Sequence, residues 1–341
     1  MSHPPLFWGY SVQKNKALYI TLLILAPLLI FGVSLLIGRY PKPLFMPLSV
    51  LINDELAQKL VFNLRLPRLI MALALGMSLS AAGGVMQMLF RNPLVEPGFL
   101  GVSQGAGFGA AFSILFLGSA PLMIETSAAI FGIIGLALSY FIARRIRYGG
   151  WVLRLVLAGI AISALFSAGL GVLKYLADPL AQLPEIVFWL LGGLWSVTWG
   201  DLVYVLPVVV VGLTIIILMR WRLNLLALGD ETAATLGVSV KKERLLLLTA
   251  AVLITAVVIS VSGLIGWIGL IIPHIARRIT GANAANFIPV SISLGGIFAI
   301  ICDNIARTLT AGEIPLGILT SLIGAVVFLL LMMRPSLRYL K

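Results

Sequence analysis

The chain has 341 residues, of which 60% are hydrophobic and 11% are charged, and its mean hydropathy is +1.10. This composition excludes an ordinary soluble domain, because such domains carry about 25% charged residues. Apolar runs of about 18 residues or more recur along the chain, and runs of this length can cross a bilayer core of about 30 Å. The runs are continuous rather than alternating, which excludes a transmembrane β-barrel. The sequence therefore predicts an all-α polytopic membrane protein.

We expect about ten membrane crossings, taken in chain order from the apolar runs. The run at 263–273 is too short for a full span, and we expect a half-helix buried among its neighbours there. The single cysteine, Cys302, lies in an apolar run and argues against a thiolate metal site. The predicted crossings are 17–38, 66–88, 101–118, 121–143, 152–173, 201–220, 245–261, 263–273, 287–309 and 314–333.

The net charge of +12 has a simpler explanation than a nucleic-acid partner, which we do not expect. In membrane proteins Lys and Arg collect in the loops that stay in the cytoplasm. With ten crossings, most of the basic residues fall on the side that holds both termini and segment 224–244. We therefore expect both termini and this segment to be cytoplasmic. With an odd number of crossings, the basic residues would no longer fall mainly on one side of the membrane. This supports counting 263–273 as a crossing.

Segment 224–244 is the longest polar interruption of the chain. Asp230, Glu231 and Thr232 are expected to begin a short helix, because acidic residues favour the positive end of a helix dipole, and Gly237 is expected to end it. A helix of two turns is unstable alone, so we expect the segment to dock on a partner. A solvated loop is the alternative, but it leaves an uncovered apolar face unexplained, formed by Leu225, Leu226, Leu228 and Leu236.

The sequence lacks the motifs of an enzyme or of a nucleotide-binding subunit. It contains no G-x-x-x-x-G-K-[ST] loop, no H-E-x-x-H and no Cys/His cluster, so we expect no catalytic residue and no metal ligand in this chain. Asp303 and Arg307 lie one helical turn apart inside a predicted crossing, where they can pair. A charge pair at that depth is expensive and can mark a functional site, and a structural pair that only neutralises itself is an equally good interpretation. An ion-coupled secondary transporter that uses Asp303 is therefore an alternative interpretation.

Several segments resemble the signature of the FecCD/BtuC-type permeases of ABC importers, the family that takes up iron-siderophores, haem and cobalamin. The resemblance covers essentially residues 60 to 335, in the family's order. The segments are Arg65-Leu-Pro-Arg68, GGVMQMLFRNPLVEPGFLGVSQGAG (83–107), LLGGLWSVTW (190–199), LNLLALGDETAATLGV (223–238), GLIGWIGLIIPHIARR (263–278) and EIPLGILTSLIGAVVF (313–328).

This resemblance implies a type II ABC importer permease fold with ten transmembrane helices and a short cytoplasmic coupling helix. The chain would be one transmembrane domain, 1–341, with six helices in 17–220, the ATPase-coupling segment 224–244 and four helices in 245–333. It would act as a homodimer in the lipid bilayer, with two cytoplasmic ATP-binding subunits and a periplasmic or lipid-anchored substrate-binding protein. The resemblance also implies the bacterial or archaeal cytoplasmic (inner) membrane as its location.

The resemblance also assigns site residues by position. The ATPase-coupling residues would be Leu225, Leu226, Leu228, Gly229, Asp230, Glu231, Thr232, Ala233, Leu236 and Gly237. The arginines that meet carboxylates of the binding protein would be Arg65, Arg68 and Arg307, since a guanidinium fork suits a carboxylate. The cytoplasmic gate would include Asn92, Pro93 and Leu94, with a second part at Val152 and Leu153. Cobalamin-type members carry small hydroxyl residues at that second part, and this chain does not.

The implied function is transport of a metal chelate, namely iron-siderophore, haem or cobalamin, or of an oxyanion such as molybdate. Transport would proceed by ATP-driven alternating access. The chain would bind no cofactor, because ATP and Mg would sit on the partner ATPase. The sequence does not identify the cargo.

Overall fold

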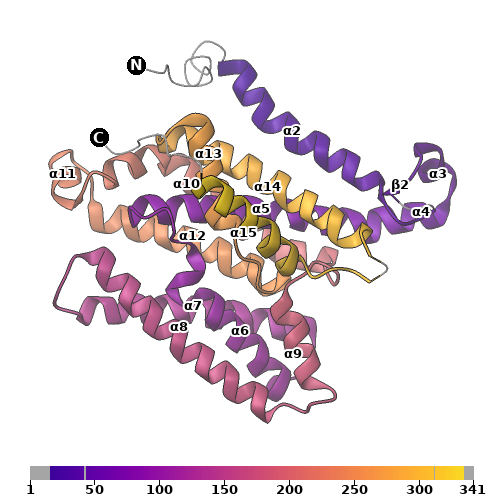
Figure 1. Ribbon diagram of the computed structural model, residues 1–341, viewed down its shortest axis with the longest axis horizontal. Coiled ribbons are helices and arrows are strands. Elements are labelled where there is room, and N and C mark those ends of the chain that lie inside the picture. Colours follow the sequence, from indigo (N-terminus) through magenta and orange to yellow (C-terminus); the bar gives the residue numbers. More distant parts are fainter. Residues whose placement is uncertain (1–15, 42–43, 311, 334–341) are drawn as a thin grey trace.

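The computed structural model describes residues 16–41, 44–310 and 312–333, with side chains described from residue 21 onward. Both termini lie outside the described residues, as do Lys14, Arg334, Arg338 and Lys341, on which the predicted charge partition partly relies. Within the described part of the chain, helices dominate and the prediction of an all-α protein is confirmed (Figure 1).

The first half of the chain contains one short hairpin and several long helices. Strands β1 and β2 pair antiparallel, with Ile37 opposite Phe45. Elements η1 and η3 are π-helical turns and η2 is a 3-10 turn. The elements are α2 (Lys16–Leu36), β1 (Ile37–Gly38), β2 (Leu44–Phe45), α3 (Leu48–Asn53), α4 (Glu55–Leu60), η1 (Val61–Arg65), α5 (Leu66–Leu89), η2 (Pro97–Leu100), α6 (Val102–Phe112), η3 (Ser113–Leu117), α7 (Pro121–Arg145) and α8 (Trp151–Leu176).

The second half is helical throughout its described elements. These are α9 (Gln182–Leu191), α10 (Trp199–Leu226), α11 (Asp230–Thr235), α12 (Val240–Ser262), α13 (Ile268–Thr280), α14 (Ala284–Thr308) and α15 (Leu316–Met333). Among the described residues, seven helices are long and apolar enough to cross a membrane. Each of the ten predicted crossings has a helical counterpart, and α6 and α13 are the shortest of these. Helices α3, α4 and α9 were not predicted.

The predicted half-helix at 263–273 is wrong in its bounds. Residues 263–267 are not helical, because Gly263 (φ 68°) and Trp267 (φ 71°) hold the backbone in the left-handed region. Helix α13 begins only at Ile268 and runs through Pro273 to Thr280. Pro273 has no N–H for the carbonyl of Gly269, four residues earlier. The Gln87 Nε2 of α5 donates to that carbonyl instead, at 3.2 Å, and this bond lets the helix continue.

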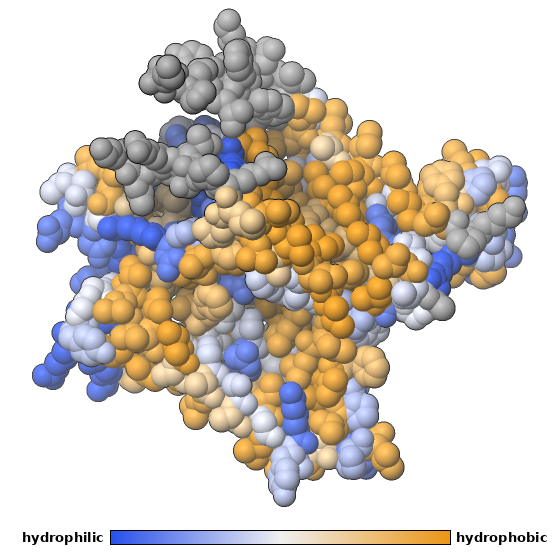
Figure 2. Space-filling view, viewed as in Figure 1, coloured by the Kyte–Doolittle hydropathy of each residue, from blue (hydrophilic) through white to orange (hydrophobic). Residues whose placement is uncertain are grey.

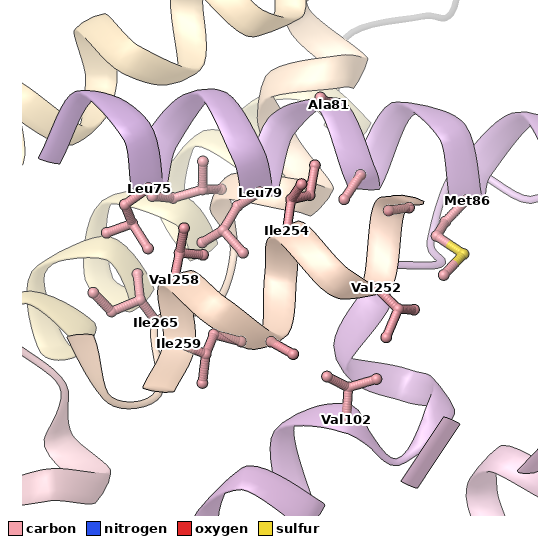
Figure 3. Close-up of a cluster of buried hydrophobic side chains, with 14 of the residues drawn as sticks. Leu75, Leu79, Ala81, Met86, Val102, Val252, Ile254, Val258, Ile259 and Ile265 are labelled. Atoms are coloured by element: carbon pink, nitrogen blue, oxygen red, sulfur yellow. The ribbon is translucent and has the colours of Figure 1, made fainter. Parts of the chain in front are cut away.

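Helix α5 lies at the centre of the molecule and packs against α10, α12, α13 and α14 (Figure 1). In its most apolar stretch 83% of the residues are buried, against 33% in α7, α8 and α10 and 28% in α15. Figure 3 shows Leu75 and Leu79 of α5 facing Ile254 and Val258 of α12. The outer helices therefore keep wide apolar faces that are free to meet lipid or a second copy of the chain.

Long helices separate two polar ends of the molecule. At the start of α10, the Trp199 Nε1 donates to the carbonyl of Phe62 at 3.1 Å, close to α4. The 28 residues of α10 end at Leu226, just before α11, so these two ends lie roughly 40 Å apart at about 1.5 Å per residue. Figure 1 places α11 and the α3–α4 pair at opposite ends. Figure 2 shows a broad hydrophobic band between them, with hydrophilic residues gathered at the α11 end.

Close helix contacts at glycine generate a first prediction. A Cβ added at Gly76 of α5 would lie 2.0 Å from the carbonyl oxygen of Gly295 in α14, whereas one at Gly171 of α8 would meet nothing within 4 Å. We expect Gly76→Ala to destabilise the protein by about 1–3 kcal/mol, the usual cost of overpacking. Gly171→Ala is the matched control and should not lower the melting temperature in detergent, because the added methyl group meets no atom and alanine favours the helix. Equal melting temperatures for the two variants would contradict the close α5–α14 packing.

Candidate functional site

The predicted short helix in segment 224–244 is present as α11 (Asp230–Thr235). Gly229 precedes it with φ at 121°, and Gly237 follows it with φ at 80°, a conformation that a side chain disfavours. Both acidic residues of the predicted helix start, Asp230 and Glu231, lie in its first turn. Glu231 and Thr232 are exposed, whereas Ala233 is fully buried and anchors the helix on the protein.

The apolar face predicted for this segment is only half correct. Leu226 is the last residue of α10 and is 2% exposed, and Leu225 packs against the core. Leu226 therefore belongs to the interior, because the helix places it on the inward face. Leu228 and Leu236 are 56% and 54% exposed. These two leucines, one on each side of α11, form the uncovered apolar surface.

Asp230 ties α11 to the second turn of α12 through Arg244. The Arg244 guanidinium donates to both carboxylate oxygens of Asp230, with Nη1 to Oδ2 at 3.2 Å, and this hydrogen-bonded pair holds the pKa of Asp230 below its usual value. The same guanidinium lies over the Trp151 ring, 4.4 Å from its centroid. Arg244 is 6% exposed although it lies at the polar end of the molecule. It is thus shared between α11 and α8.

The predicted gate residues lie next to this contact. A cavity of about 590 Å³ is bordered by residues 228–232, by Val152 and by Arg91. Leu153 is 46% exposed and follows Val152 in the first turn of α8. Thus the structure brings the coupling segment beside the second part of the predicted gate.

The first part of the predicted gate is a tight, exposed turn after α5. Asn92, Pro93 and Leu94 are all exposed, and the Asn92 Oδ1 accepts a hydrogen bond from the Leu94 N–H at 2.9 Å. An Asx turn of this kind fixes the backbone without any tertiary contact. Arg91 before it adopts φ at 50°. The gate prediction stays a prediction, because one chain shows the turn but not what it closes against.

The three predicted docking arginines line one cavity of about 260 Å³ at the other end of the molecule. All three are largely buried, with Arg65 and Arg307 at 9% exposure and the Arg68 side chain at 11%. Arg65 donates to the carbonyl of Leu35 at 3.1 Å. Arg307 donates to the carbonyl of Ser34 at 2.7 Å. Their positions are consistent with a docking role, but their guanidinium groups already have partners within the chain.

The charge pair predicted within one helix is part of a larger cluster. The Arg307 Nε lies 3.5 Å from the Asp303 Oδ2, as the spacing predicted. The Arg68 Nε lies closer, 2.7 Å from the Asp303 Oδ1, and the Arg68 Nη1 is 2.8 Å from Glu313. Asp303 is fully buried between the two arginines. Because Arg68 is 235 residues away in sequence, spacing alone could not reveal its pairing with Asp303.

Sequence reasoning missed several residues that complete these sites. Arg39 and Glu313 border the arginine cavity. Near the gate turn, Glu96 accepts a hydrogen bond from the backbone of Trp267, the residue just before α13. The sequence signal that could have identified Glu96 is a charged residue directly before a proline, Pro97, in a mainly apolar chain. Within the described ranges, no group of three or more His, Cys, Asp or Glu could hold a metal ion.

The buried cluster generates a second prediction. Removing one partner of a buried ion pair leaves an uncompensated charge, which typically costs about 3–5 kcal/mol. We expect Arg68→Ala to lower the free energy of unfolding of the purified protein by an amount in that range, measured by thermal unfolding in detergent. Lys59→Ala removes a surface partner of Glu55, where the side chains are 65% and 83% exposed, and should have little effect. A similar loss in both variants would contradict the buried pairing of Asp303.

Comparison with known proteins identifies the family. The model of the FecCD transport family matches residues 23–334. The chain is 37% identical over 319 residues to the molybdate import system permease protein MolB of Haemophilus influenzae, covering 89% of this chain and 94% of that protein. It is 40% identical over 280 residues to the hemin transport system permease protein HmuU of Yersinia pestis, covering 80% of this chain and 82% of that protein.

Solved structures agree with the sequence comparison. A metal-chelate type ABC transporter in an inward-facing conformation matches 93% of this chain and 99% of its own chain, with a TM-score of 0.85 and 37% identity. PsaBC from Streptococcus pneumoniae shares the fold at a TM-score of 0.56 and 18% identity, covering 86% of this chain and 97% of its own. The chain therefore has the type II ABC importer permease fold, is a multi-pass membrane permease, and belongs to the FecCD transport family.

Proposed function

We propose that this chain is the transmembrane subunit of an ABC importer, moving its cargo across the inner membrane by ATP-driven alternating access. One observation carries the proposal. A FecCD-family permease presents a short helix, α11, with two uncovered leucines at one polar end. A helix of six residues is too short to be stable alone. The exposed Leu228 and Leu236 beside it would fit an apolar groove on a partner.

The cargo class follows from the relatives. Proteins similar to this chain are named for molybdate, hemin, cobalamin and iron(3+)-hydroxamate. We infer that the cargo is a metal chelate of the iron-siderophore, haem or cobalamin type, or an oxyanion such as molybdate. Since relatives of similar identity carry different cargo names, we infer that a separate binding protein makes most of the selection.

The partners follow from the two polar ends. An ATP-binding subunit, two copies in the assembly, would dock on α11 at the cytoplasmic side and hold the ATP and Mg. A periplasmic or lipid-anchored binding protein would meet the cavity that contains Arg65, Arg68 and Arg307, where basic side chains outnumber acidic ones. A second copy of the chain would cover part of the exposed apolar faces of α8 and α15 and complete the path.

The secondary-transporter alternative is not favoured by the surroundings of Asp303. A coupling carboxylate must exchange its ion or proton during each cycle. Asp303 is fully buried and lies between Arg68 and Arg307, which compensate its charge. The cluster has the properties of a structural clamp between α5 and α14.

The importer proposal predicts co-purification of an ATPase. We expect tagged permease, extracted from its native membrane in mild detergent, to retain a nucleotide-binding subunit. ATP hydrolysis by the eluate should rise when the binding protein is added, since docking at the outer end changes the state of the permease. A permease that elutes alone and shows no ATP hydrolysis would overturn the importer proposal.

The coupling surface predicts a more specific result. Leu228→Asp combined with Leu236→Asp should abolish association with the ATPase, because both side chains are exposed and a docking groove would have to bury two charges. The fold should survive, as judged by gel filtration. Leu180→Asp, at 91% exposure beyond the end of α8, is the control and should leave association intact. Leu226 is unsuitable for this test because it is a core residue. Unchanged association of the double variant would overturn docking at α11.

A further inference from the structure

The importer proposal assigns no role to Arg244. It is the last residue of segment 224–244 and lies in the second turn of α12, outside the coupling residues 225–237 that the family resemblance assigns, and its side chain is only 7% exposed. Its guanidinium contacts Asp230 of α11 on one side and the Trp151 ring of α8 on the other. A buried arginine that joins two separate elements fixes their relative position, because each contact constrains the same rigid plane.

From Trp151 the contacts continue to both parts of the predicted gate. Trp151 is the first residue of α8 and directly precedes Val152 and Leu153. Its ring also packs against the Phe90 ring, with centroids 5.9 Å apart. Phe90 lies at the end of α5, two residues before Asn92 and the rest of the exposed turn. One indole therefore connects Arg244 to the start of α8 and to the end of α5.

A second, weaker contact runs from α11 to the gate turn. A Cβ at Gly229 would lie 3.3 Å from the Arg91 Nη2, so the Arg91 side chain rests on the backbone just before α11. Arg91 also contributes to the electrostatic stabilisation of ionised Asp230. Asp230 thus attracts Arg244 and Arg91 together, and Arg244 is the better anchored of the two because it is buried and bonded to both carboxylate oxygens.

Arginine is the side chain that this arrangement needs. The guanidinium can donate two bonds to one carboxylate while its flat face stacks on an aromatic ring. Lysine keeps the charge, but its ammonium group is a compact point charge with no plane that could stack on the ring. The substitution Arg244→Lys therefore removes the geometry of the contact and preserves its charge.

We propose that Arg244 is a positioning residue that transmits movement of α11 to the start of α8 and, through Trp151 and Phe90, to both gate segments. The inference rests on the proposed importer function. When the ATPase moves α11, Asp230 moves with it, and the bonded guanidinium carries Trp151 in the same direction. Without this contact, α11 would still bind the ATPase, but its movement would no longer reach α8.

Spin labels can test this in the whole complex, because Cys302, the one cysteine of the chain, is buried. Labels would be placed separately at Ala234→Cys on α11 and at Tyr148→Cys, an exposed residue just before α8. Distances between the two copies would be measured in nanodiscs containing the permease and its ATPase, with ADP and with a non-hydrolysable ATP analogue. We expect the analogue to change the distance at both positions in the otherwise wild-type complex.

In Arg244→Lys, we expect the ATPase to stay bound and the nucleotide-dependent change to persist at residue 234 but to be lost at residue 148. Trp151→Leu should give the same result and serves if the lysine variant folds poorly. Arg222→Lys is the matched control, since Arg222 only approaches Glu243 at 3.9 Å and is half exposed; it should leave both changes intact. In the isolated permease, Arg244→Lys should also increase label mobility at residue 148, and Arg222→Lys should not.

The outcomes separate the two proposals. If the wild-type permease binds no ATPase, the importer proposal fails and this inference fails with it. If the ATPase binds and the change at residue 148 persists in both Arg244→Lys and Trp151→Leu, the importer proposal stands and the role of Arg244 is overturned. Loss of the change at residue 234 as well would also overturn it, because it would show that Arg244 only holds α11 in place.

Discussion

Buried backbone groups without a hydrogen-bond partner cost several kcal/mol each in hydrocarbon, and this constraint shapes the centre of the molecule. Pro273 removes a bond inside α13, and Gln87 of α5 supplies the missing donor to Gly269 and also bonds Leu270 at 3.1 Å. Arg277 in turn donates to the side-chain amide oxygen of Gln87, Oε1. These side-chain hydrogen bonds hold α13 against α5 and satisfy the carbonyl groups near Pro273. Helix α5 also packs against α10, α12 and α14 and so forms the centre of the helix bundle.

Charged residues are arranged differently at the two polar ends of the molecule. At the arginine cavity, Arg68, Asp303 and Arg307 compensate one another in a buried cluster, which fixes α5 to α14 and leaves an excess of basic groups facing the cavity. At the α11 end, Asp230 and Arg244 pair at the surface of the bundle, where one member is exposed. The first arrangement suits a rigid platform for a charged partner, and the second suits a contact that moves with α11.

Close similarity to permeases named for different cargo has a physical explanation. The described interior is packed mainly by apolar residues, and it holds no cluster of three or more metal-ligating side chains. Such an interior offers few groups that could distinguish a chelate from an oxyanion. Under the proposed importer function, the permease would contribute the conformational change and the binding protein would make most of the selection, in keeping with the different cargo names of similar proteins.

The sequence by itself determined the helical membrane fold, the positions of the long apolar helices, the short helix at Asp230 and the pairing of Asp303 with Arg307, because these depend on composition, run length and local spacing. Only the tertiary structure decided that Arg68 also pairs with Asp303, that Leu226 is core while Leu228 is exposed, and that Arg244 stacks on Trp151. Those contacts join residues far apart in the chain, and local patterns carry no information on which distant faces meet.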